Sequence, residues 1–124
     1  DLALVEGELN AGRSADALRR IDALAATHPR TGAISLLRGR ALVLEGRNAE
    51  ALEAFQAAVR EDPLLGDGYF HLGLALARAG ELRRARESLA TFARLPEAAG
   101  ARLETATRAM QLLAELGRIL EEER

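Results

Sequence analysis

Few side chains in this sequence have the types and spacing that catalysis or metal binding requires. The two histidines could bind a metal ion together, but His28 precedes a proline at a predicted helix end and His71 lies inside a predicted helix, at a different place in the repeat. The chain has no cysteine, and it contains no metalloprotease motif, phosphate loop, dinucleotide-binding turn or nucleophile elbow. We therefore predict a protein that is not an enzyme and that needs no metal and no cofactor.

The densest group of basic side chains, Arg83, Arg84 and Arg86, could recognise an anion. Glu81 and Glu87 flank this group, so we interpret it as a charged face exposed to solvent. Across the whole chain, 17 basic residues stand against 19 acidic ones, and the net charge is −2. Because binding to a phosphate backbone requires an excess of positive charge, nucleic acid is not an expected partner.

The elements that would position any functional side chain repeat along the sequence. Three glycines recur every 34 residues, and an alanine follows each glycine five residues later. These residues are Gly12, Gly46 and Gly80 with Ala17, Ala51 and Ala85. A period of about 34 residues is typical of helix-turn-helix units that stack into a solenoid, because one unit alone cannot bury its apolar face. The sequence therefore favours a binding scaffold built from helices.

Two stretches of the chain carry the fullest version of the repeat. In the first stretch, the first predicted helix carries Ser35, Gly39 and Leu42, and the second carries Ala51, Phe55 and Ala58 and is followed by Pro63. In the second stretch, the first predicted helix carries Tyr69, Leu72, Gly73 and Leu76, and the second carries Ala85, Leu89 and Phe92 and is followed by Pro96. These residues resemble the tetratricopeptide repeat, which places an aromatic and a Leu-Gly pair on its first helix and an alanine, an aromatic and a final proline on its second. The resemblance implies an all-α, right-handed superhelical array of antiparallel helix pairs.

Glycine and proline set the predicted helix boundaries. Each turn glycine can end a helix in the left-handed conformation, and Ser14 and Asn48 are the predicted N-caps of the helices that follow. The predicted helices span residues 1–11, 14–27, 33–45, 48–61, 66–79, 82–95 and 97–122. The predicted organisation is a shortened repeat at 1–31, full repeats at 32–65 and 66–96, and a C-terminal capping helix within 97–124.

Small residues inside the predicted pairs indicate where two helices approach each other closely. Gly39 and Gly73 lie within predicted helices, where glycine costs about 1 kcal/mol relative to alanine. Ala51 and Ala85 occupy the facing helices. We expect the close packing of the two helices to offset the cost of each glycine.

The concave surface of the array is the predicted binding surface. In the resembled family the first helices line the groove that holds peptides, and residues one position after the helix-pair contacts face this groove, about 100° around the helix. The predicted groove residues are Leu2, Glu6, Leu9, Leu36, Arg40, Val43, Leu44, Phe70, Leu74, Ala77 and Arg78. Stacking aligns Leu2, Leu36 and Phe70 as an apolar ladder that we expect to be exposed in a bare array; the alternative is burial between neighbouring repeats.

An apolar or amphipathic partner segment fits this groove best. The best-known peptide-binding variants of the resembled family hold a C-terminal carboxylate with Lys and Asn pairs, whereas the matching places here are Leu2, Glu6, Leu36 and Arg40. We therefore predict a non-catalytic protein–protein interaction module that binds a peptide or helical segment within a multiprotein assembly. The alternative is a self-associating scaffold in which the C-terminal helix or the open repeat edge joins copies into a homo-oligomer.

The sequence contains no segment that predicts membrane insertion. No run approaches the roughly 18 apolar residues that a span requires, and the first residues lack the basic region of a signal peptide. We expect a soluble protein of the cytoplasm or periplasm. Abundant alanine and the absence of lysine favour a bacterium with a GC-rich genome, and the lack of an initial Met indicates a fragment or a processed product.

Overall fold

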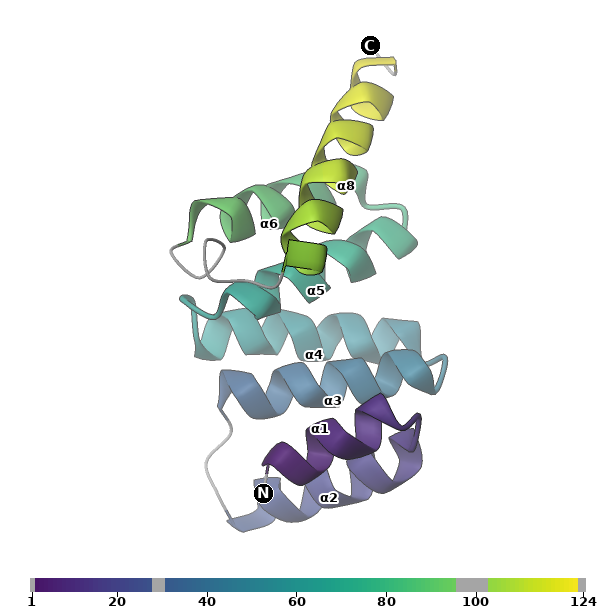
Figure 1. Cartoon of the computed structure of the whole chain (residues 1–124), viewed down its shortest axis with the longest axis vertical. Helices are drawn as coiled ribbons and strands as arrows, with labels where there is room; N and C mark the ends of the chain where they lie inside the picture. The colour runs from purple at the N-terminus through teal and green to yellow at the C-terminus, as the bar shows by residue number, and fades with distance from the viewer. Residues whose placement is uncertain (1, 28–30, 96–102, 123–124) are drawn as a thin grey trace.

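The computed structural model describes residues 2–27, 31–95 and 103–122, and it is helical throughout these ranges apart from short connections (Figure 1). The helices are α1 (Leu2–Asn10), α2 (Ser14–Thr27), α3 (Gly32–Leu44), α4 (Asn48–Glu61), α5 (Gly66–Arg78), α6 (Leu82–Arg94) and α8 (Leu103–Glu122). The described ranges contain no strand, and the predicted all-α fold is confirmed. The prolines Pro29 and Pro96 and the predicted start of the last helix at residue 97 lie outside the described residues.

The turn inside each helix pair follows one backbone pattern. The three repeat glycines have positive φ angles, which are 77° at Gly12, 76° at Gly46 and 81° at Gly80. In the second turn the N–H of Gly46 donates to the carbonyl of Val43 (3.0 Å), and the N–H of Arg47 donates to the carbonyl of Leu42 (2.9 Å). This pair of hydrogen bonds is a Schellman motif, which requires the left-handed conformation that glycine adopts without strain. The predicted role of the turn glycines is confirmed.

The prediction that Ser14 and Asn48 cap the next helices is wrong by one residue. The carbonyls of Arg13 and Arg47 accept the first hydrogen bonds of α2 and α4, each at 3.0 Å, so the caps lie one position earlier. The turn is so short that the residue after the glycine both closes the preceding helix and opens the next one. The side chain of Arg47 caps no backbone group and instead pairs with Glu50 at 2.6 Å.

Within the helix pairs, two glycines permit close packing. A Cβ atom added to Gly39 would overlap the ring of Phe55 on the facing helix. A Cβ atom added to Gly73 would lie 2.7 Å from Cγ of Leu89. Neither position has space for a side chain, so the predicted close approach of α3 to α4 and of α5 to α6 is confirmed. The alanines that follow the turn glycines are also fully buried.

The pairs stack in chain order, and α8 crosses the end of the stack against α6 (Figure 1). Along one side of the array, α1 contacts α3 and α3 contacts α5. On α8, Ala109, Leu116 and Leu120 are buried, whereas Met110 is 60 % exposed. Of the helices described, none combines the length and apolar character needed to cross a membrane. The inner side of α3 and α5 is therefore a surface to which residues from distant parts of the chain contribute.

Candidate functional site

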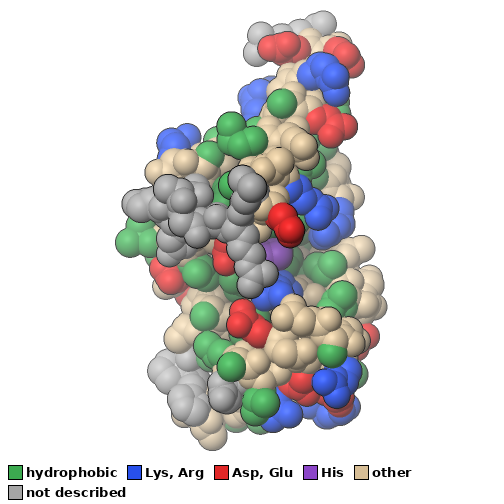
Figure 2. Space-filling model, in the orientation of Figure 1, with side chains coloured by type: hydrophobic (Ala, Val, Ile, Leu, Met, Phe, Trp, Pro, Cys, Tyr) green, Lys and Arg blue, Asp and Glu red, His purple; other side chains and the backbone are tan. Residues whose placement is uncertain are grey.

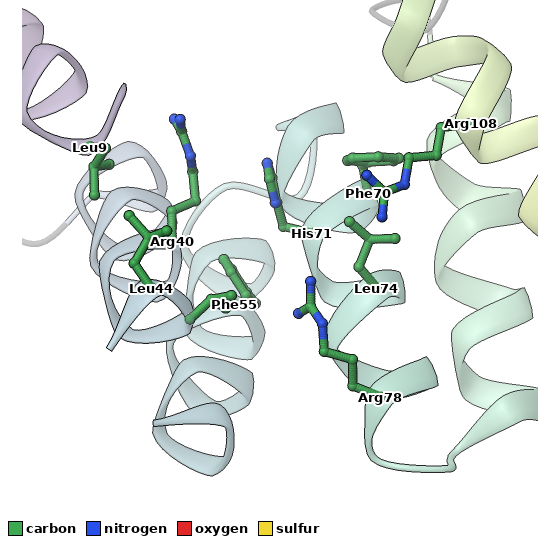
Figure 3. A pocket seen from close by; sticks show the side chains of 10 residues that line it. Leu9, Arg40, Leu44, Phe55, Phe70, His71, Leu74, Arg78 and Arg108 are labelled. Atoms are coloured by element: carbon green, nitrogen blue, oxygen red, sulfur yellow. The ribbon is translucent and has the colours of Figure 1, made fainter. Parts of the chain in front are cut away.

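A cavity of about 290 Å³ opens between α3 and α5. Its lining comes from five helices and includes apolar, aromatic and basic side chains (Figure 3). The lining residues are Leu9 of α1, Arg40, Val43 and Leu44 of α3, Phe55 of α4, Phe70, His71, Leu74 and Arg78 of α5, and Arg108 of α8. Because the lining residues come from more than one helix pair, the cavity is a product of stacking and no single pair could form it.

Three rings form the aromatic part of the cavity wall. The His71 imidazole stacks on the Phe55 ring, with centroids 5.5 Å apart and an interplanar angle of 21°. The edge of the same imidazole meets Phe70 at 5.4 Å and 79°, and Phe70 lies 5.6 Å from Phe92 in the core. Phe55 has room beside α3 because Gly39 presents no side chain to it. One glycine therefore serves both the helix contact and the placement of a cavity ring.

The histidine in this wall is uncharged near neutral pH. The pKa of His71 is lowered to about 4, chiefly by burial of the imidazole and then by the positive charges of Arg40, Arg78 and Arg108. A neutral imidazole contributes ring surface and one donor and one acceptor to the cavity, but no charge. The charge of the site comes from the three arginines alone.

Two of these three arginines lack a carboxylate partner. On the rest of the described surface some basic side chains are paired, as Arg20 is with Glu8 at 2.6 Å and Arg38 is with Asp22, whereas others, such as Arg83 and Arg84, form no ion pair with a described residue. At the cavity, the closest carboxylate to Arg40 is that of Glu6 at 3.8 Å, and within the described ranges Arg78 and Arg108 form no ion pair. Figure 2 shows basic side chains above and below the histidine in the middle of this face, with acidic side chains beside them. The cavity thus combines an apolar wall with three arginines, of which only Arg40 has an ion-pair partner in the described ranges.

Comparison with known proteins identifies the fold that builds this cavity. A family model described as tetratricopeptide repeat matches residues 2–65, slightly more than half of the chain. The chain belongs to the tetratricopeptide repeat family. No curated protein sequence matches it. The predicted resemblance is therefore confirmed by the family match as well as by the helix pairs.

Several solved structures share this tetratricopeptide-repeat architecture. The type III secretion translocator chaperone SycD of Yersinia enterocolitica is 22% identical, with a TM-score of 0.81 over 99% of this chain and 83% of that chain. PcrH of Pseudomonas aeruginosa, in complex with the chaperone binding region of PopB, is 23% identical, with a TM-score of 0.77 over 90% of each chain. MamA is 17% identical, with a TM-score of 0.71 over 98% of this chain and 77% of that chain. At these identities the likeness establishes the fold.

The tetratricopeptide-repeat array brings most of the predicted groove residues to the cavity. Those in its lining are Leu9, Arg40, Val43, Leu44, Phe70, Leu74 and Arg78. The others, Leu2, Glu6, Leu36 and Ala77, do not line it, although Glu6 approaches Arg40. Taking the residue that follows each helix-pair contact therefore selects side chains on the inner face of the array. It does not predict how far along that face the cavity extends.

The prediction of an exposed ladder is wrong for two of its three members. Leu36 is 8 % exposed and Phe70 is 6 % exposed, and both belong to the main core cluster. Leu2 is 38 % exposed on α1, at the edge of the described array. The cause is contact between the first helices of successive tetratricopeptide repeats, which closes over large side chains at the level of Leu36 and Phe70. The alternative of burial between repeats holds at these two positions.

Three cavity residues are absent from the predicted groove. Phe55 matches an aromatic signature of the tetratricopeptide repeat, and it also packs against Gly39 of the facing helix. His71 follows Phe70 directly, so helix periodicity places it one step further around the helix, and this is the signal that could have found it. Arg108 lies on α8, whose crossing direction has no counterpart in the repeat pattern.

Metal binding and the outer basic group lie apart from this site. No cluster of three His, Cys, Asp or Glu side chains suited to a metal ion occurs within the part of the chain that is described. Arg83 and Arg84 are exposed on α6, and neither they nor Arg86 line the cavity. The chemistry available at the cavity is therefore recognition by apolar contact, hydrogen bonding and positive charge.

Proposed function

We propose that this chain is a non-catalytic interaction module that holds a segment of a partner protein in the cavity between α3 and α5. The observation that carries the proposal is an open, largely apolar cavity on the inner face of a tetratricopeptide-repeat array. Leu44 lines this cavity and is 53 % exposed, so it offers apolar surface that a bound segment would cover. The proposal also draws on structural neighbours solved with protein segments: PcrH with chaperone binding regions of PopB and PopD, and SycD with a peptide of YopD.

The size of the cavity favours a peptide over a small-molecule cofactor. Its volume of about 290 Å³ is at the lower end of the range of roughly 300–1,000 Å³ in which small-molecule ligands are enclosed. One or two side chains of a longer segment would fill it, while the rest of the segment lies along α3 and α5. Binding then depends on a few anchoring side chains, as in other peptide grooves.

The experiment is a selection of displayed random 12-residue peptides on the purified chain, followed by calorimetry with the selected peptides. We expect one-to-one binding that Leu44→Glu weakens about 30-fold, or about 2 kcal/mol, because the new carboxylate occupies the apolar mouth of the cavity. Since Leu44 is exposed, its replacement should leave the melting temperature nearly unchanged.

Leu64→Glu is the matched control, because Leu64 is 70 % exposed and lies outside the cavity lining. Equal loss of binding in both variants would contradict a site between α3 and α5. A failure to select any peptide, together with a mass that rises with concentration in light scattering, would favour the self-associating scaffold instead.

A further inference from the structure

We propose that the bound segment carries Asp or Glu side chains next to its apolar anchor, and that Arg40, Arg78 and Arg108 bind these carboxylates. The inference rests on the proposed function and specifies the chemistry of the segment. A segment with apolar and acidic side chains would complement the apolar wall of the cavity and the positive charge of its arginines.

The first argument is the position of the three guanidinium groups. They come from three different helices, α3, α5 and α8, and all three line the same cavity (Figure 3). Each of them lowers the pKa of His71, so all three positive charges lie around this ring. Stacking brings these like charges to one cavity despite their mutual repulsion, and within the described ranges only Arg40 has a carboxylate partner, Glu6.

The second argument is the shortage of carboxylates beside them. Glu6 is the one acidic group within 4 Å of these arginines in the described ranges, and it reaches only Arg40, at 3.8 Å. Glu104 lies one turn before Arg108 on α8 without forming an ion pair with it. Although the chain has more acidic than basic residues, Arg78 and Arg108 thus form no ion pair within the described ranges. A partner carboxylate would supply the missing counter-charge.

The third argument distinguishes a side-chain carboxylate from other anions. Guanidinium groups bind carboxylates through paired N–H donors, and the bond strengthens where apolar surface excludes water. Since the three arginines are distributed over three helices, they suit acidic side chains at internal positions of a segment better than one terminal carboxylate. A polyphosphate or nucleic acid would have to place its chain against the leucines and rings of the wall.

The test uses peptides selected from the random library while their C-termini are joined to the display protein, so that they carry no free terminal carboxylate. We expect Asp or Glu to be enriched beside a Leu, Ile or aromatic residue. Selected peptides are then synthesised with amidated C-termini, each with a partner in which Glu is replaced by Gln. Loss of the carboxylate should weaken binding about tenfold or more.

The protein side of the test replaces arginines that are exposed and therefore tolerate substitution. Arg78→Gln and Arg108→Gln should each weaken binding of the acidic peptides about tenfold and leave the Gln peptides unaffected. Arg118→Gln is the matched control, because Arg118 is exposed on the same helix as Arg108 but does not line the cavity. It should leave binding of both kinds of peptide unchanged.

Two results would overturn the inference, and they differ in what they say of the proposed function. Selected peptides that lack acidic residues, or that bind Arg78→Gln as well as the natural chain while Leu44→Glu abolishes binding, would overturn the acidic chemistry and keep the peptide site. If no peptide binds, or if Leu44→Glu does not weaken the binding, both the acidic chemistry and the peptide site are overturned.

Discussion

The interior of the helix pairs and the cavity between them are built from neighbouring residues but follow different rules. Gly39 lies against the ring of Phe55 with no space for a side chain, and the next residue, Arg40, lines an open cavity. Gly73 and Leu74 are related in the same way on α5. The comparison shows that the repeat signature determines how two helices pack, while the residue after each of these two glycines lines the cavity.

The two regions are joined where aromatic rings belong to both. Phe55 packs on Gly39 and stacks on His71, and Phe70 lines the cavity while it contacts Phe92 in the core. A change at these rings should therefore alter stability and binding together. Substitutions that separate the two properties test where the boundary between the regions lies.

The largest expected effect is that of Phe70→Ala, which tests whether this cavity residue belongs to the core. Because Phe70 is 6 % exposed and packs on Phe92, we expect a loss of about 3–4 kcal/mol in the free energy of unfolding, measured by urea denaturation. Leu44→Ala is the control within the same cavity, and it should cost less than about 1 kcal/mol because Leu44 is exposed. If Phe70→Ala were as stable as the natural chain, the burial of Phe70 would be contradicted and the prediction of an exposed ladder would stand.

A smaller effect is expected from acid, through the buried imidazole of the cavity. His71 has a pKa of about 4 when folded, and an unfolded histidine has one near 6.5. As the pH falls from 6.5 to 4 the unfolded chain takes up this proton first, so the free energy of unfolding should fall by at most about 3 kcal/mol and then stop changing on this account.

The measurement is urea denaturation between pH 7 and pH 4 for the natural chain and for His71→Gln. The glutamine side chain does not titrate, so the stability difference between the two proteins should shrink across this window as acid removes the contribution of the neutral imidazole. Parallel curves for the two proteins would show that His71 titrates as an exposed histidine does.

The smallest stability effect separates the two regions most clearly. Gly39→Ala and Gly73→Ala should each cost about 1–3 kcal/mol, because the new methyl group overlaps the facing helix. Gly39→Ala should also weaken peptide binding, since it displaces Phe55 in the cavity wall. Gly73→Ala should leave binding nearly unchanged, because its contact Leu89 does not line the cavity.

Gly7→Ala and Gly117→Ala provide the matched controls for these two variants. An added Cβ atom at either position meets nothing within 4 Å, so each alanine should stabilise its helix by about 0.5–1 kcal/mol. If Gly39→Ala and Gly73→Ala behaved as these controls do, the close packing inside the pairs would be contradicted. Equal effects of both on peptide binding would contradict the separation of the two regions.

Much of this architecture could be predicted from local signals. The turn glycines at Gly12, Gly46 and Gly80 required only a backbone argument, and their positive φ angles depend on no distant residue. The N-caps were misplaced by one position because one residue closes one helix and opens the next, a compression that residue preferences do not reveal. The side chains that line the cavity could be predicted only where helix periodicity alone determines which face of the helix they occupy.

The sequence by itself determined the helix pairs, because a 34-residue period, glycine turns and small contact residues act within one repeat. Only the tertiary structure decided which inner-face side chains remain open. Phe70 is covered and Leu44 is exposed, although both were predicted groove residues, because burial depends on how closely successive repeats approach. The juxtaposition of Arg40, Arg78 and Arg108 likewise required the direction of α8, which is set by packing against α6 and by no repeated pattern in the chain.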